Sequence, residues 1–77
     1  MTFNLQRLKA ERVAEGMTQE QFASRIGMSR IAYAKREAGI VDISVEELSK
    51  IMDALGYDYS KVSIFFCTFR FQKRTIK

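Results

Sequence analysis

The chain has 77 residues, of which 47% are hydrophobic and 29% are charged, and its formal net charge is +4. This composition excludes an intrinsically disordered protein, and the length allows one domain with a single core. Because the chain has one cysteine and no histidine, an internal disulfide, a multi-cysteine zinc site and histidine-based catalysis are excluded.

The same features favour a cytoplasmic protein. No apolar segment reaches the roughly 18 residues of a membrane span, and the start, MTFNLQRLKAER, lacks the apolar core of a signal peptide. The excess of 13 Lys and Arg over 9 Asp and Glu suits nucleic acid or an anionic surface, although charge alone does not decide. We expect no cofactor, no metal, no membrane and no small-molecule substrate as partner.

The first predicted helix covers residues 4–15. Asn4 is a suitable N-cap, and Gly16 follows the last helical residue, where a left-handed backbone is needed. The residues expected to face the core are Leu5, Leu8 and Val13.

The second predicted helix covers residues 18–26. Thr18 and Gln21 have the spacing of a capping box, in which each side chain binds the backbone amide of the other residue. Gly27 ends this helix. The residues expected to face the core are Phe22, Ala23 and Ile26.

The third predicted helix covers residues 29–37, with Ser29 as its N-cap and Gly39 after its end. Its expected inward residue is Tyr33, and its other positions are mostly small or basic. Two short helices around a turn at Gly27, the second with a basic outer face, form the pattern of a helix-turn-helix.

The fourth predicted helix starts at Ser44 and ends at Gly56. Glu47 completes a second capping box with Ser44. The residues expected to face the core are Leu48, Ile51, Met52 and Leu55.

The tail, KVSIFFCTFRFQKR, is rich in residues that favour strands, and it alternates in polarity from position 65 onward. We predict a strand over residues 62–72, with a short fifth helix over residues 60–66 as the alternative. A lone strand cannot satisfy its own backbone, so we expect it to pair antiparallel with a second copy in a homodimer. The residues expected at this dimer contact are Phe65, Phe66, Cys67, Phe69 and Phe71.

Residues 5–56 resemble a known family. The segment LKAERVAEGMTQEQFASRIGMSRIAYAKREAG, followed by SVEELSKIMDALG, is similar to the phage repressor and Cro-like (XRE-type) helix-turn-helix regulators. The resemblance implies a mainly α, lambda-repressor-like helix-turn-helix domain. With the reading of the tail above, we expect four helices, or five, and a C-terminal strand that pairs across a dimer. Residues 1–59 would form the DNA-binding part, and residues 60–77 the dimerisation tail of the same compact domain.

By this resemblance, the helix over residues 29–37 lies in the DNA major groove. Arg30 is the expected bidentate partner of a guanine, and Ile31 is expected to contact a thymine methyl group. Lys35 would reach either a guanine or a phosphate. The alternative for all three is a solvated surface residue.

The resemblance also implies structural and phosphate-binding roles. Arg12 and Glu37 are expected to form an ion pair that joins the first helix to the end of the third. Arg36 departs from the family pattern, so it would either extend over the core edge toward a phosphate or loosen the local core. The residues expected to bind DNA phosphates are Thr18, Gln19, Ser29 and Arg36.

The resulting hypothesis is a transcriptional regulator, more specifically a Cro-like repressor, that binds a palindromic double-stranded operator as a homodimer. It would act at the nucleoid of a bacterium or of a phage-infected host. A second hypothesis is an antirepressor-type interaction module, because the apolar and acidic loop over residues 40–43 and the aromatic tail suit a protein partner. An enzyme is disfavoured, because the sequence offers no nucleophile and base pair.

Overall fold

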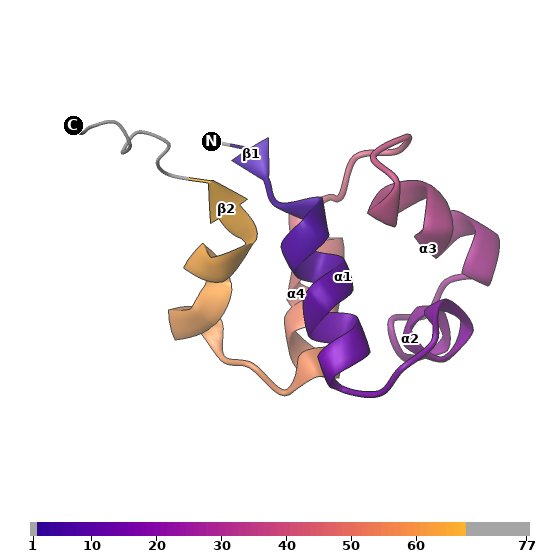
Figure 1. The fold of residues 1–77 in the computed structure, drawn as a ribbon, viewed down its shortest axis with the longest axis horizontal. Coiled ribbons are helices and arrows are strands. Elements are labelled where there is room, and N and C mark those ends of the chain that lie inside the picture. The colour runs from indigo at the N-terminus through magenta and orange to yellow at the C-terminus, as the bar shows by residue number, and fades with distance from the viewer. Residues whose placement is uncertain (1, 68–77) are drawn as a thin grey trace.

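The computed structural model describes residues 2–67 and shows a mainly helical protein (Figure 1). The elements in chain order are β1 (Thr2–Phe3), α1 (Leu5–Ala14), α2 (Gln19–Arg25), α3 (Arg30–Glu37), α4 (Val45–Leu55), the 3₁₀ helix η1 (Tyr59–Phe65) and β2 (Phe66–Cys67). In Figure 1, α2 and α3 lie on one side of the central pair α1 and α4, and η1 and β2 lie on the other side.

Side-chain caps start each of the four α-helices. Thr18 and Gln21 form the predicted capping box, with reciprocal bonds of 3.1 and 2.9 Å, and Ser44 and Glu47 form the second, with two bonds of 3.0 Å. The N-caps of α1 and α3 are the predicted Asn4 and Ser29. Because each cap satisfies an otherwise unpaired amide and contributes about 1 kcal/mol, four of them define the helix starts firmly.

One continuous core connects the helices. The rings of Phe22 on α2 and Tyr33 on α3 meet edge to face, with centroids 5.2 Å apart. The small Ala23 is 1% exposed, which lets α2 and α3 cross closely. The buried hydrophobic residues are Leu8, Phe22, Ala23, Ile26, Tyr33, Ile51, Met52, Leu55 and Phe65.

The prediction that Val13 faces the core is wrong, because its side chain is 56% exposed. The inward face of α1 instead runs through Leu5, Leu8 and Arg12, at the i, i+3, i+7 spacing of one helix face. Arg12 is 6% exposed. The charged Arg12, and not its apolar neighbour Val13, therefore faces inward at this turn of α1.

The predicted strand over residues 62–72 is wrong for its first part. Residues 62–65 belong to η1, so the alternative of a short helix describes them better, and within the described residues the C-terminal strand is limited to β2. The remainder of the predicted strand lies outside the described residues. The partner of β2 is β1 of the same chain, which pairs antiparallel with Thr2 opposite Cys67 and Phe3 opposite Phe66.

Aromatic packing explains this C-terminal structure. Phe65 is fully buried, and its ring stacks on that of Phe3 with centroids 5.5 Å apart. The Asn4 amide donates to the Phe65 carbonyl at 2.5 Å, which anchors η1 to the start of α1. Phe65, expected at a dimer contact, therefore lies in the core of its own chain, and the N-terminal residues supply a second strand that sequence reasoning did not find.

No helix among residues 2–67 combines the length and the apolar character needed to span a membrane.

Candidate nucleic-acid interface

Helix α3 presents a polar and cationic outer surface. Arg30 and Lys35 are exposed, and Ile31 is 61% exposed, although it is a large apolar side chain. Neither cation forms an ion pair with any other residue in the part of the chain that the structure describes. All three residues expected to read bases are therefore exposed, while Tyr33 is the residue of α3 that is buried in the core.

A buried polar group, which we call the Glu37 cluster, joins α1, α2 and α3. The predicted ion pair is present: Arg12 Nε lies 2.9 Å from Glu37 Oε2, and Arg12 Nη2 lies 3.2 Å from Glu37 Oε1. Tyr33 Oη also donates to Oε2 at 2.6 Å, and Gln19 Nε2 donates to Oε1 at 2.9 Å. Arg12 Nη1 donates to the Met17 carbonyl at 2.7 Å, which ties the α1–α2 turn to the same group.

The Glu37 cluster keeps its carboxylate ionised. Burial alone would raise the pKa of Glu37, but hydrogen bonds from Arg12, Tyr33 and Gln19 outweigh burial and lower it. Burial, followed by the hydrogen bond to Glu37, raises the pKa of Tyr33, so its hydroxyl stays protonated as a donor. The hydrogen bond to Glu37 raises the pKa of Arg12. The cluster is therefore a charge-compensated brace between the helices.

Three predicted phosphate-binding residues lie at helix starts. Thr18 and Ser29 use their side-chain oxygens to cap α2 and α3. Gln19 donates its side-chain amide to Glu37, so it belongs to the brace as well as to the surface at the start of α2. Sequence reasoning missed this contact, together with the Tyr33 hydroxyl; the i, i+4 spacing of Tyr33 and Glu37 was the available signal.

Arg36 has two protein partners in place of a free guanidinium. Its Nε lies 3.0 Å from Glu47 Oε1, and its Nη1 donates to the Ala32 carbonyl at 2.8 Å. The hydrogen bond from Arg36, followed by the Ser44 amide, lowers the pKa of Glu47. Arg36 therefore fastens α3 to the capped start of α4, and its Nε and Nη1 donors are already used within the protein.

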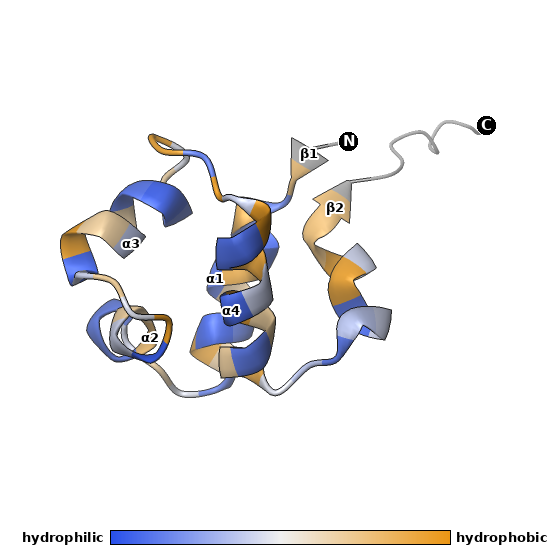
Figure 2. Ribbon diagram, turned by 180° about the vertical axis from the view of Figure 1, so that it is seen from behind, coloured by the Kyte–Doolittle hydropathy of each residue, from blue (hydrophilic) through white to orange (hydrophobic). Residues whose placement is uncertain are grey.

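The loop between α3 and α4 is apolar at its surface. Ile40 is 73% exposed, and in Figure 2 the ribbon of this loop has hydrophobic colour at its tip. The amides of Ile40 and Val41 both donate to the Lys35 carbonyl, at 2.9 and 3.3 Å, so neither is available to a phosphate. The loop over residues 40–43 thus has no cation, and two of its amide donors are already used, which makes it a poor partner for the DNA backbone.

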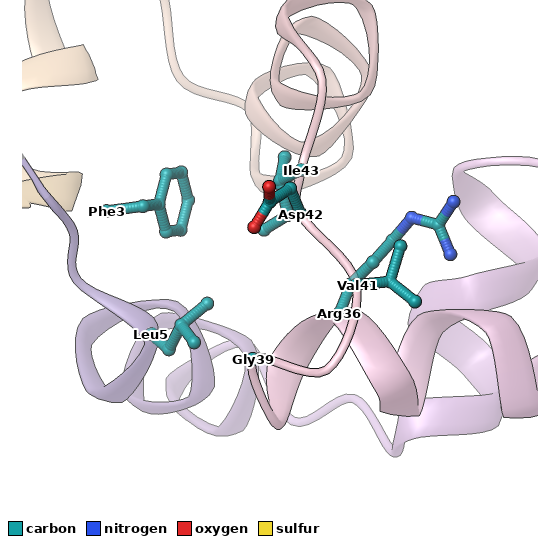
Figure 3. Close-up of a pocket in the computed structure, with 7 residues that line it drawn as sticks. All are labelled: Phe3, Leu5, Arg36, Gly39, Val41, Asp42 and Ile43. Atoms are coloured by element: carbon teal, nitrogen blue, oxygen red, sulfur yellow. The ribbon is translucent and has the colours of Figure 1, made fainter.

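A pocket of about 190 Å³ adjoins this loop. Figure 3 shows Phe3 and Leu5 on one side of it and Val41, Asp42 and Ile43 on the other. The lining is mostly apolar, with one carboxylate from Asp42 and one guanidinium from Arg36, so it suits an apolar group and favours neither sign of charge. Among residues 2–67, no three His, Cys, Asp or Glu side chains gather in a way that could hold a metal ion.

A model of the helix-turn-helix family matches residues 8–62, which is more than half of the chain and includes both α2 and α3. No curated protein and no solved structure matches the chain.

Proposed function

This chain belongs to the helix-turn-helix family of phage repressor and Cro-like regulators, which makes it a DNA-binding transcription regulator, and we propose that it is a repressor acting on a palindromic operator. The observation that supports this most is the exposed surface of α3, where Arg30 and Lys35 have no carboxylate partner in the described residues. An α-helix fits the major groove of B-DNA, and free cations beside small residues allow close approach to base edges.

Arg30 is the proposed base reader with the largest effect. It is the first residue of α3, where family geometry directs side chains toward base edges, and a bidentate pair with guanine O6 and N7 contributes about 1–3 kcal/mol of discrimination. Ile31 is proposed to contact a thymine methyl group. Lys35 lies one turn further along and is proposed to bind a guanine or a phosphate.

Two copies are proposed to act together, because one short helix contacts too few bases for high specificity. Within the described residues, β2 pairs on one side with β1, and Phe66 is only half-buried against Phe3. We propose that the β2 edge and the residues after it, including Phe69 and Phe71 outside the described residues, pair with a second copy. The two α3 helices would then read half-sites about 34 Å apart, or a multiple of this distance.

Repression is the proposed outcome of binding. The two-copy protein occupies promoter DNA and blocks polymerase without further contacts, whereas activation needs an added contact with polymerase. The test is selection of bound duplexes from a random-sequence pool. Enrichment of a palindrome supports the proposal, and retention of no duplex at low salt contradicts it.

A second candidate function is binding to another regulator, and the loop over residues 40–43 favours it. Ile40 is 73% exposed beside a mostly apolar pocket that Asp42 and Arg36 also line, and such an exposed apolar surface suits a protein partner better than DNA. If the selection retains no duplex, this function is preferred. Its direct test is loss of regulator binding on Ile40→Asp, with Val13→Asp, which changes an exposed valine on α1, as the control.

A further inference from the structure

We infer that Lys9 on α1 binds a DNA phosphate and extends the DNA contact beyond the helix-turn-helix pair; this inference rests on the proposed function. Its basis is an open groove of about 290 Å³ between α1 and α3. From α1 the groove is lined by Gln6 and Lys9, from α3 by Ala34 and Ala38, and from the start of α2 by Gln19.

Lys9 is the cation on α1 that remains available to a ligand. Arg7 Nε lies 2.6 Å from Glu11 Oε2, and Arg12 is bound in the Glu37 cluster. In the part of the chain that the structure describes, Lys9 has neither an ion pair nor a side-chain hydrogen bond, and it is exposed. An ammonium group at the rim of a groove fits a phosphate, because it provides three donors and a full positive charge.

Glu37 also lines the groove, and its charge must be considered. Its side chain is only 6% exposed, and each of its two oxygens accepts two hydrogen bonds in the Glu37 cluster. The guanidinium of Arg12 compensates the carboxylate charge at 2.9 Å. Apart from Glu37, the groove is therefore lined by Lys9, the amides of two glutamines, and the apolar side chains of Leu5, Ala34 and Ala38, so an anion meets no free carboxylate.

The walls of the groove are fixed at both ends. Near the start of α1, a Cβ placed on Gly39 would lie 3.1 Å from Leu5 Cδ1, so the end of α3 packs tightly against α1. Further along α1, the Arg12–Glu37 ion pair joins the same two helices. A phosphate would thus bind a preformed surface and would not have to order a mobile one.

The occupant that fits this groove is the DNA sugar-phosphate backbone. The groove is continuous with the outer surface of α3, since Ala34 and Ala38 follow Arg30 at helical i+4 and i+8 positions on that surface. When α3 lies in the major groove, the bordering strand must pass along one side of α3. Small alanines on that side leave room for the strand, and Lys9 lies across from them.

The test measures binding of a fluorescent 24-base-pair mixed-sequence duplex (a length of about two helical turns) over a range of salt concentrations. For Lys9→Ala, we expect the slope of log affinity against log salt to fall in magnitude by about 0.9 for each bound subunit. Lys9→Arg should keep the wild-type slope. The matched control is Lys50→Ala, because Lys50 is exposed on α4 in a different hollow, with Arg25 and Asp53.

The outcomes distinguish failure of the Lys9 contact from failure of DNA binding. A wild-type slope for Lys9→Ala, or an equal loss for Lys50→Ala, overturns the Lys9 contact while leaving DNA binding in place. If wild-type protein binds no duplex, the proposed function itself fails. A further supporting result is that Lys9→Ala leaves the preference between two duplex sequences unchanged, because a phosphate contact carries no base information.

Discussion

Arg12 and Glu37 form a bidentate ion pair in the interior of the protein. Arg12 Nε lies 2.9 Å from Glu37 Oε2, and Arg12 Nη2 lies 3.2 Å from Glu37 Oε1. The two side chains are 8% and 6% exposed, and 25 residues separate them along the chain. The pair joins the end of the proposed recognition helix to α1. It therefore sets the position of α3 relative to the rest of the molecule before any DNA is bound.

The first prediction concerns this pair. Arg12→Ala leaves a buried carboxylate without its cation, so we expect a loss of about 3–5 kcal/mol in the free energy of unfolding. Replacing Arg12 and Glu37 together by Met should cost much less than the sum of the single changes. Urea unfolding followed by circular dichroism measures all three variants, and additive losses would show that the two residues act independently.

The second prediction concerns acid. Burial opposes ionisation of Glu37, but its hydrogen bonds prevail and hold its pKa in the folded protein below the ordinary 4.5. Its contribution to stability is therefore complete above about pH 4.5 and is lost as the pH falls through the folded pKa. We expect Glu37→Gln to be less stable at pH 7 and to lose less stability between pH 5 and pH 3 (roughly the carboxylate range) than wild type.

The matched variant for this pH experiment is Glu20→Gln, which changes an exposed glutamate in the first turn of α2. It should retain the wild-type loss of stability in acid. Parallel pH curves for wild type and Glu37→Gln would exclude a role for Glu37 in acid unfolding.

The third prediction compares two glycines with left-handed backbones, Gly39 at φ 83° and Gly56 at φ 75°. Alanine at either position pays about 1 kcal/mol of backbone strain. At Gly39 the added Cβ also meets Leu5 Cδ1 at 3.1 Å, whereas at Gly56 no atom lies within 4 Å. We expect Gly39→Ala to lower the melting temperature more than Gly56→Ala; the reverse order would mean that the Leu5 contact relaxes freely.

The fourth prediction concerns a helix cap. Ser44 Oγ accepts the Glu47 amide at 3.0 Å, so Ser44→Ala should cost about 1 kcal/mol of unfolding free energy. Ser24 is exposed within α2 and caps nothing, and Ser24→Ala should be neutral or slightly stabilising because alanine favours helices. Thermal unfolding of the two variants gives the comparison, and equal melting temperatures would argue against the cap.

The fifth prediction concerns assembly. The wild-type chain should sediment as a dimer at micromolar concentration, because the proposed operator reader needs two α3 helices at a fixed spacing. If the chain is a monomer across this concentration range, the proposed pairing of two copies through β2 is wrong. DNA binding would then have to come from a single domain.

The helices were predictable because their signals are local. Caps such as Thr18 and Ser44, followed by residues with one apolar face, define a helix without knowledge of the rest of the chain. Tyr33 was identified as inward for the same reason. The family resemblance, confirmed by the match over residues 8–62, supplied the arrangement of these helices.

The C-terminal part was not predictable, because its structure depends on distant residues. An apolar run of this length is compatible with a strand or a helix, and the contact that decides is the stacking of Phe65 on Phe3. No local signal marks Thr2–Phe3 as a strand, because two residues are too few to show the alternation of polar and apolar side chains that is typical of strands. The periodicity of the first helix gave the inward position to Val13, whereas the family resemblance predicted the pair of Arg12 with the distant Glu37 that the structure shows.

In the interface, residue exposure was easier to predict than side-chain partners. Arg30, Ile31 and Lys35 are exposed on α3, but their contacts with bases stay predictions. Arg36 was expected near a phosphate and is paired with Glu47, because the second capping box holds that carboxylate within 3.0 Å of its Nε. Such a pairing depends on how the loop after α3 places the start of α4 beside Arg36, which sequence spacing does not give.

The most direct measurement is a comparison of affinities for two duplexes of equal length, one selected from a random pool and one with its bases scrambled. At physiological salt, the wild-type protein is expected to bind the selected duplex at least about 10³-fold more tightly. Arg30→Ala should lose part of this ratio, and Arg25→Ala, which removes an exposed arginine at the opposite end of α2 from Gln19, should retain it. Equal affinity of wild-type protein for both duplexes would contradict sequence-specific recognition by α3.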